Sequence, residues 1–254
     1  MSQSTQRPAV LILGATGGIG CALARQLSRL DYALSLGSRG GERLDSLSAE
    51  LTAHSCTFAA TDSASVDACI NSAFQNHGRL NGVVNCVGSL LLKPAHTTTD
   101  EEWAGVLATN LNSAFYILRS AANRMMRDGG GSIVLMSSAA AQRGLINHEA
   151  IAAAKAGVIG LAQSAAATYA RYNIRVNCVA PGLTRTPLTE PLTRYEASLK
   201  ASAALHPLGR IGEPEEVASA IRWFLDPQQS WVTGQVLAVD GGLSSVQSRM
   251  STHS

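Results

Sequence analysis

The feature that most constrains the fold is a cluster of glycines that directly follows an apolar run near the N-terminus. Residues 9–13 read AVLIL, residues 14–20 read GATGGIG, and residues 21–27 have the apolar spacing of a helix. Glycines at a strand-to-helix turn let the backbone turn tightly and approach a pyrophosphate, whose charge then faces the free N–H groups of the helix N-terminus. A plain glycine-rich turn is the alternative. The position after the first strand favours a dinucleotide-binding unit.

Short aliphatic runs recur along the chain and alternate with longer stretches of helical spacing. Short runs without clean polar alternation favour strands that are buried on both faces of a parallel sheet. The runs cover 9–13, 33–37, 56–60, 82–86, 132–136, 174–180 and 235–239, and the helical stretches cover 19–30, 64–77, 100–127, 150–172 and 214–225. This order predicts an α/β fold: a single Rossmann-like doubly wound domain over residues 1–254, with about seven parallel strands and helices on both faces.

Composition narrows the class of protein further. The net charge is only +2, with 20 basic against 18 acidic side chains, so we expect no nucleic-acid partner. The five cysteines are scattered and form no C-x-x-C pair, so we expect reduced thiols in a cytoplasmic protein, with neither disulfides nor a bound metal. We find no apolar leader and no apolar run of membrane-spanning length, so we expect no membrane partner.

Two kinds of segment lie outside this regular pattern. The polar ends, about 1–7 and 244–254, are expected to be flexible. The segment 183–212 contains three prolines and no predicted strand. Long irregular segments inside compact domains are often functional lids, so we expect a loop that covers the substrate there.

Further motifs stand at the ends of the expected strands and on the helix that follows the fifth one. The glycine-rich turn has the spacing G-x-x-x-G-x-G, and the other motifs are NCVG at 85–88, Asn110, Ser138, Lys155, Pro181-Gly182 with Thr186, GQ at 234–235 and VDGG at 239–242. In these motifs, over nearly its whole length, the sequence resembles the short-chain dehydrogenase/reductase family. The resemblance implies a nicotinamide dinucleotide cofactor and a small-molecule substrate that is interconverted between carbonyl and alcohol.

The end of the second strand indicates which dinucleotide is preferred. An acidic residue there would bind the ribose hydroxyls of NAD and repel a 2′-phosphate, but the chain reads Gly37-Ser38-Arg39. The guanidinium of Arg39 suits a phosphate, so we expect NADP(H) to be preferred, with NAD(H) as the alternative. By resemblance, Asp62 contacts the adenine and Thr186 the nicotinamide carboxamide. The full expected cofactor set is Gly14, Thr16, Gly17, Gly18, Ile19, Gly20, Ser38, Arg39, Asp62, Asn85, Gly88, Lys155, Pro181, Gly182, Thr184 and Thr186.

The chain departs from the family pattern at the proton donor. The resemblance implies catalytic roles for Ser138, Asn110 and Lys155, together with a tyrosine four residues before the lysine, where this chain has Ile151. Isoleucine cannot donate a proton, and loss of general acid catalysis costs about 10²–10⁴-fold in rate. His148, three residues before Ile151, is the candidate substitute, because its ordinary pKa suits proton transfer near neutrality. Tyr195 and His206 are weaker candidates.

Three functions therefore stay open. The first is an oxidoreductase with a non-standard proton donor, and the second is a nucleotide-binding homologue with little or no activity, acting as a sensor, scaffold or silent subunit. The third is a lyase or cyclase that uses the same pocket without redox chemistry. A Ser138–Lys155 hydrolase is the least favoured, since the chain has no G-x-S-x-G elbow.

The helix expected over 150–172 is dense in alanine and glycine. Small side chains let a neighbouring backbone approach closely, either within one chain or from another subunit. Because members of the family associate through this helix and the one before it, the resemblance implies a homodimer or homotetramer. The substrate pocket is expected to be mainly apolar, lined by residues 89–92, 139–148 and 183–206.

Overall fold

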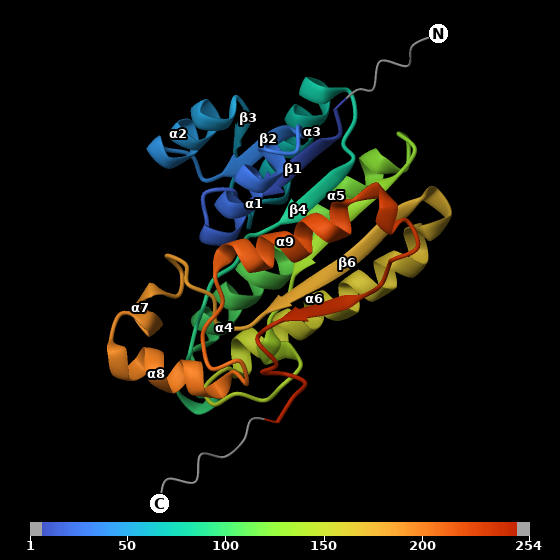
Figure 1. Ribbon diagram of the computed structural model, residues 1–254. Helices are drawn as coiled ribbons and strands as arrows, with labels where there is room; N and C mark the ends of the chain where they lie inside the picture. The colour runs from blue at the N-terminus through green and yellow to red at the C-terminus, as the bar shows by residue number, and fades with distance from the viewer. Residues whose placement is uncertain (1–6, 248–254) are drawn as a thin grey trace, which may run out of the picture.

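A computed structural model describes residues 7–247, and it contains one seven-stranded sheet (Figure 1). Every strand pairs with its neighbours in parallel, in the order β3-β2-β1-β4-β5-β6-β7. The strands are β1 (Ala9–Leu13), β2 (Ala33–Ser38), β3 (His54–Thr57), β4 (Gly82–Asn85), β5 (Gly131–Met136), β6 (Ile174–Pro181) and β7 (Val236–Val239). The predicted doubly wound parallel sheet is confirmed.

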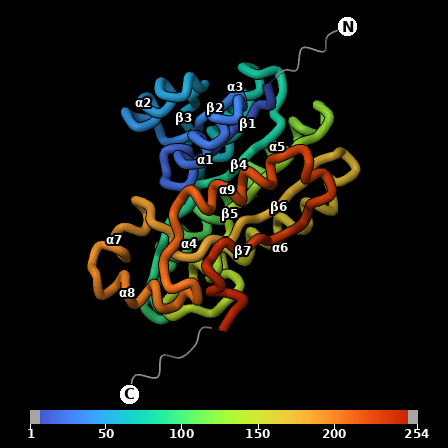
Figure 2. Tube along the Cα trace, in the orientation of Figure 1, coloured from blue at the N-terminus to red at the C-terminus, as the bar shows by residue number. Residues whose placement is uncertain are grey.

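Helices cover both faces of the sheet, as predicted (Figure 1, Figure 2). One core cluster joins the sheet to α3 (Ser63–His77), α5 (Ser113–Met125) and α6 (Glu149–Tyr169), and a second joins the other face to α1 (Gly18–Ser28), α2 (Glu42–Leu51) and α9 (Pro214–Leu225). Within β1, Leu11 and Leu13 belong to the first cluster, while Val10 and Ile12 belong to the second. Alternate side chains of one strand thus enter opposite cores, which explains why the strand is continuously apolar.

The strand order reverses direction at β1, which pairs with β2 on one side and β4 on the other. Leu13 lies opposite Gly37 in β2 and opposite Asn85 in β4. Where the order reverses, the loops that leave the carboxyl ends of neighbouring strands turn to opposite faces and leave a crevice. The glycine-rich turn follows β1 directly, so the fold brings it to this crevice.

Four expectations about local structure need correction. The segment 183–212 is not simply irregular, since it contains α7 (Glu190–Thr193) and α8 (Glu196–Leu205). The helix expected over 100–127 is divided into α4 (Asp100–Leu107) and α5 by a π-helical turn over Ala108–Asn112. The third strand lies at 54–57 rather than 56–60, because Phe58 already belongs to the loop after it, and the helix α2 was not predicted.

The structure also corrects the expectation that all cysteines are reduced. Cys56 in β3 and Cys69 in α3 are paired in a disulfide, with Cα atoms 5.5 Å apart. Their separation of 13 residues hid this pairing, because nothing in a spacing of that length shows that a strand and the following helix face each other. Cys21, Cys86 and Cys178 are free. The expected flexible ends fall largely on residues 1–6 and 248–254, which lie outside the described residues.

Within residues 7–247 one helical stretch, Glu149–Tyr172, has the length and composition of a membrane span, with a mean hydropathy of 1.3. This stretch has nearly the limits of the helix expected over 150–172. Val158 and Ala162 on this stretch are buried in the core beside β6. Packing against the sheet therefore accounts for part of its apolar character.

The turn between α5 and β5 offers a test of the packing. Gly129 and Gly130 both have positive φ, +83° and +90°. A Cβ on Gly130 would lie 2.6 Å from the carbonyl carbon of Asn173, whereas no described atom lies within 4 Å of a Cβ on Gly129. We expect Gly130→Ala to lower the free energy of unfolding by about 3–5 kcal/mol, because the collision adds to the backbone strain.

Gly129→Ala is the matched control for this substitution, since it introduces the backbone strain alone and is expected to cost about 1–2 kcal/mol. Chemical denaturation of both variants beside the wild type measures the difference. Equal losses would contradict the close approach of Gly130 to Asn173.

Candidate active site

The glycine-rich turn is wedged between the ends of β2 and β4. The N–H of Gly14 donates to the carbonyl oxygen of Gly37 at 2.8 Å, and a Cβ on Gly14, whose φ is +81°, would lie 2.7 Å from the carbonyl carbon of Cys86. Only glycine fits this approach and this backbone conformation. A Cβ on Gly20 would likewise meet the backbone of Gly14 and Ala15. These glycines are required because the backbone of the turn passes close to the backbones at the ends of β2 and β4.

The turn presents the N-terminus of α1 to the crevice. The N-cap residue Gly17 provides no side-chain cap, and the first turn of α1 contains no acidic side chain. The first N–H groups of a helix have no partner within the helix, and they carry a partial positive charge. In α1 neither a capping side chain nor a carboxylate competes for these groups, so the end of the helix suits the negative charge of a phosphate.

The end of β2 brings a guanidinium to the same region. Ser38 is buried and its Oγ accepts the N–H of Gly40 at 3.2 Å, while Arg39 is exposed and takes part in none of the ion pairs between residues 7 and 247. Arg43 on α2 donates to the carbonyl oxygen of Thr16 at 2.6 Å. The sequence pattern did not indicate Arg43, because its link to Thr16 depends on α2. Asp62 caps α3 by accepting the N–H of Ala64 at 3.0 Å.

Lys155 lies on α6 with its ammonium group turned toward the end of β5. The residue is 7% exposed, and its Nζ donates to the carbonyl oxygen of Met136 at 2.9 Å. Ser137, which the sequence analysis did not select, donates from Oγ to the backbone carbonyl of Lys155 at 3.0 Å. Lys155 therefore links α6 to the end of β5 twice, once through its ammonium group and once through its backbone carbonyl.

Burial determines the electrostatics of Lys155. It lowers the pKa of the ammonium group to about 8, because the charged form loses water. The neighbouring thiols are Cys178 and Cys86, whose own pKa values burial raises to about 12. Both thiols are therefore neutral near pH 7. None of the ion pairs between residues 7 and 247 includes Lys155, so a buried ammonium group stands here without a carboxylate.

Asn110 is held beside Lys155 by the π-helical turn. Its side chain is buried, and Nδ2 donates to Ser89 Oγ at 2.9 Å and to the carbonyl oxygen of Val106 at 3.0 Å. Its Oδ1 accepts the N–H of Ser89 at 3.1 Å. A Cβ on Gly88 would lie 3.3 Å from this Oδ1 and 3.6 Å from Lys155 Nζ, so Gly88 allows both groups to approach the same backbone. The structure thus brings Gly88, Asn110 and Lys155 together.

Ser138 stands two residues beyond the carbonyl that binds the Lys155 ammonium. Its Oγ accepts the N–H of Ala140 at 3.2 Å and caps a short 3₁₀ turn. This bond uses a lone pair and leaves the hydroxyl hydrogen for a substrate oxygen. Asn85 at the end of β4 has a comparable structural bond, since its Oδ1 accepts the N–H of Val87 at 3.0 Å.

The turn of α6 before Lys155 is apolar. Ile151 is 3% exposed and packs in a small cluster with Val106, Ala150 and Ala154. His148 precedes the first residue of α6, and its Nδ1 lies 2.7 Å from the carbonyl oxygen of Ile146. Because a carbonyl only accepts, Nδ1 carries a hydrogen and Nε2 is the nitrogen left for a proton. Across residues 7–247 no hydrogen bond joins His148 to Lys155 or Ser138.

The segment after β6 closes over the glycine-rich turn. Gly182 donates to the carbonyl oxygen of Val239 at 3.1 Å, and the buried Thr184 donates from Oγ1 to the carbonyl oxygen of Gly182 at 3.1 Å. A Cβ on Gly18 would lie 2.7 Å from Thr186 Cγ2, so the two segments touch. Thr186 is therefore placed against the start of α1.

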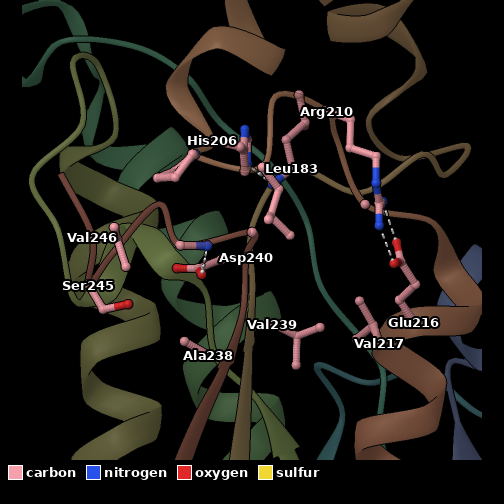
Figure 3. Close-up of a pocket in the computed structure, with 15 residues that line it drawn as sticks. Leu183, His206, Arg210, Glu216, Val217, Ala238, Val239, Asp240, Ser245 and Val246 are labelled. Atoms are coloured by element: carbon pink, nitrogen blue, oxygen red, sulfur yellow. Dashed lines mark hydrogen bonds and ion pairs between the residues drawn. The ribbon is translucent and has the colours of Figure 1, made fainter. Parts of the chain in front are cut away.

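The two weaker proton-donor candidates of this segment are not suited to that role. Tyr195 is 64% exposed. His206 is 3% exposed, and both of its ring nitrogens are already hydrogen-bonded, to Ser202 and to Leu183. It lines a pocket of about 510 Å³ at the ends of β6 and β7 that includes none of Lys155, Asn110 and Ser138 (Figure 3). That pocket therefore lies outside the group formed by Lys155, Asn110 and Ser138.

Comparison with known proteins agrees with this arrangement. Residues 14–244 match a protein family described as enoyl-(acyl carrier protein) reductase. The chain is 35% identical over 242 residues to the 3-oxoacyl-[acyl-carrier-protein] reductase of Thermotoga maritima, covering 92% of this chain and 96% of that protein.

Solved structures agree equally well. A short-chain type dehydrogenase/reductase from Mycobacterium ulcerans has a TM-score of 0.91 at 32% identity, covering 97% of this chain and 93% of that one. An actinorhodin polyketide ketoreductase with NADPH has a TM-score of 0.90 at 28% identity, covering 96% of this chain and 100% of that one. The sheet order, the motifs at the strand ends and these likenesses have one common explanation: the chain belongs to the short-chain dehydrogenase/reductase family.

Proposed function

We propose that this protein is an NADP(H)-dependent oxidoreductase that interconverts a carbonyl and an alcohol on a small molecule, with a proton donor other than tyrosine. The observation that carries the proposal is the buried Lys155 ammonium group, which lies beside Gly88 and Asn110. It lies beside the ends of β4 and β5, and β4 pairs with β1, after which the open N-terminus of α1 follows. Relatives that reduce carbonyl groups, by their names, support the reaction class.

The residues of the crevice fit a dinucleotide cofactor. The backbone of Gly14–Gly20 and the uncapped start of α1 suit the pyrophosphate, and Ser38 and Arg39 suit the 2′-phosphate. Asp62, Asn85 and the segment from Pro181 to Thr186 complete the proposed site, with Thr186 toward the nicotinamide end. The cofactor would supply or accept the hydride.

The protein's own part of the reaction is to bind the substrate oxygen and to manage one proton. In the proposed site Ser138 donates its hydroxyl hydrogen to that oxygen, and Lys155 holds the cofactor ribose through its ammonium hydrogens. Two groups can deliver the proton in place of a tyrosine: Lys155, whose pKa of about 8 suits an acid near neutrality, and His148 through Nε2. The apolar packing of Ile151 excludes it from this role.

The same packing of Ile151 supports a second candidate, a nucleotide-binding protein of this family with little or no turnover. Ile151 occupies the turn of α6 before Lys155 with only apolar neighbours in its cluster. A protein that uses its nucleotide site for sensing or scaffolding has no need for a proton donor there. Turnover separates the two candidates, while cofactor binding does not.

We further propose that the protein self-associates through α5 and α6 as a homodimer or homotetramer. In the 18-residue apolar window of the stretch Glu149–Tyr172, only 44% is buried within one chain. Phe115 on α5 and Trp103 on α4 are 45% and 42% exposed. A second copy would cover apolar surface that a single chain leaves in water.

The cofactor preference is tested at Arg39. Arg39→Asp should weaken NADPH binding about ten- to hundredfold, since a charge-assisted bond to phosphate is replaced by repulsion, and should improve NADH binding. Arg29→Asp, at the far end of α1, makes the same change in charge and should alter neither affinity. Fluorescence titration with both nucleotides measures the effect. An unchanged preference for NADPH over NADH in Arg39→Asp would contradict the assignment of Arg39 to the 2′-phosphate.

The missing hydroxyl is tested at Ile151. We expect the wild type to oxidise NADPH with a carbonyl substrate, and we expect Ile151→Tyr to raise kcat about 10²-fold or more over Ile151→Phe. Phenylalanine is the matched control, because it brings the ring without the hydroxyl. A panel of ketones, aldehydes and quinones supplies the substrates. A silent wild type beside an active Ile151→Tyr would favour the nucleotide-binding protein without turnover.

The role of Lys155 is tested by the pH dependence of kcat/KM, which reports groups of the free enzyme. Reduction needs the protonated ammonium, so kcat/KM should fall tenfold for each pH unit above about 8. In the oxidation direction the deprotonated amine accepts the proton, so that rate should rise through the same pH range. Lys155→Arg stays charged at these pH values and should lack the transition. A wild-type profile without a transition between pH 7 and 9 would exclude Lys155 as the acid.

A further inference from the structure

His206 lies just beyond α8, where the segment that covers the strand ends returns to the sheet. Its imidazole is 3% exposed, with Nδ1 2.8 Å from the carbonyl oxygen of Ser202 and Nε2 3.2 Å from the backbone nitrogen of Leu183. A carbonyl only accepts and a backbone N–H only donates, so the hydrogen of the ring is on Nδ1 and Nε2 accepts. The ring is thus neutral, and both of its nitrogens are satisfied.

One hydrogen bond of the ring is local, and the other joins segments that are distant in the sequence. The bond to Ser202 stays within the last turn of α8. The bond from Leu183 crosses 23 residues and links α8 to the first residues after β6. Figure 3 shows the ring of His206 directed at Leu183, above Asp240 at the end of β7.

The backbone beside the ring is packed without spare room. A Cβ on Gly182 would lie 2.8 Å from His206 Nε2 and 2.9 Å from the Cα of Asp240. Gly182 therefore passes between the histidine ring and the turn after β7. The histidine ring and the bond from the Gly182 N–H to the carbonyl oxygen of Val239 together limit where the chain leaves β6.

The segment that the ring positions reaches the glycine-rich turn within a few residues. Thr184, next to Leu183, is buried and pairs with Gly212 in an isolated parallel bridge. Thr186 then touches the start of α1 at Gly18. A continuous chain of contacts connects α8, His206, Leu183 and Thr186 with the helix end that suits a phosphate.

We infer that His206 is a positioning residue of the cofactor site: its Nε2 holds the Leu183 N–H and thereby keeps Thr184 and Thr186 in the conformation that binds the nicotinamide end of NADP(H). This inference rests on the proposed function and adds a residue to it. His206 touches neither reacting group, so it acts through the backbone of the segment after β6.

Two substitutions separate the bonds of the ring. Asparagine places an amide near the position of Nδ1, so His206→Asn keeps the bond to Ser202 and loses the bond from Leu183. Glutamine reaches the position of Nε2, so His206→Gln keeps an acceptor for Leu183 and loses the bond to Ser202. The two variants are matched in polarity, and each removes one hydrogen bond.

The inference predicts that only His206→Asn impairs the cofactor site. The KM and the dissociation constant for NADPH should rise about tenfold in His206→Asn, the effect of one lost bond to a buried group, and should stay within about twofold of wild type in His206→Gln. The kcat should change little in either variant. A merely structural histidine would lower the thermal midpoint in both variants and leave the NADPH constants alone.

Hydrogen exchange provides a second measurement, which does not depend on activity. The Leu183 amide should be protected in the wild type and exchange faster in His206→Asn than in His206→Gln. An unprotected wild-type amide, or equal NADPH constants in the two variants beside tight wild-type binding, would overturn this inference alone. A wild type that binds no NADPH would overturn the proposed function and this inference together.

Discussion

The pairing of β1 with β2 on one side and β4 on the other is the constraint on which the rest of the site depends. It sends the chain to opposite faces of the sheet and leaves the end of β1 between two strand ends. Gly14 then has to turn beside the Gly37 and Cys86 backbones, which only glycine permits. This one junction places the start of α1 and the loop that bears Arg39. It also places the residues that lead from β4 to Asn110 and Lys155.

Lys155 illustrates the cost of a site built into a core. Burial disfavours its charge, and the carbonyl of Met136 with two neutral thiols compensates only in part. A group whose charged and neutral forms are close in free energy near neutral pH is poor for stability but useful for proton transfer. The adjacent turn of α6 is apolar around Ile151, so it offers no second proton donor.

Much of the framework could be predicted from the sequence, because buried parallel strands and a glycine-rich turn leave local patterns. The limits of β1 and α9 were predicted to the residue. The features that were missed depend on contacts between distant segments. The Cys56–Cys69 pairing needs β3 to face α3, the link of Arg43 to Thr16 needs α2, and the role of His206 needs α8 to return to β6. Helix α7 was missed because it has only four residues, among them Pro191 and Thr193, and α8 was missed because its small and polar residues give little apolar periodicity.

The π-helical turn at Ala108–Asn112 has a consequence for the length of the chain at this point. A wide turn holds one more residue than a regular one, and it frees the carbonyl of Val106 for the side chain of Asn110. Deleting a residue here would restore an unbroken helix, in which the carbonyl of Val106 accepts a backbone N–H and no longer holds the side chain of Asn110. At this turn the number of residues is itself part of the site. The loss of one residue there would disrupt the site as much as an exchange of side chains.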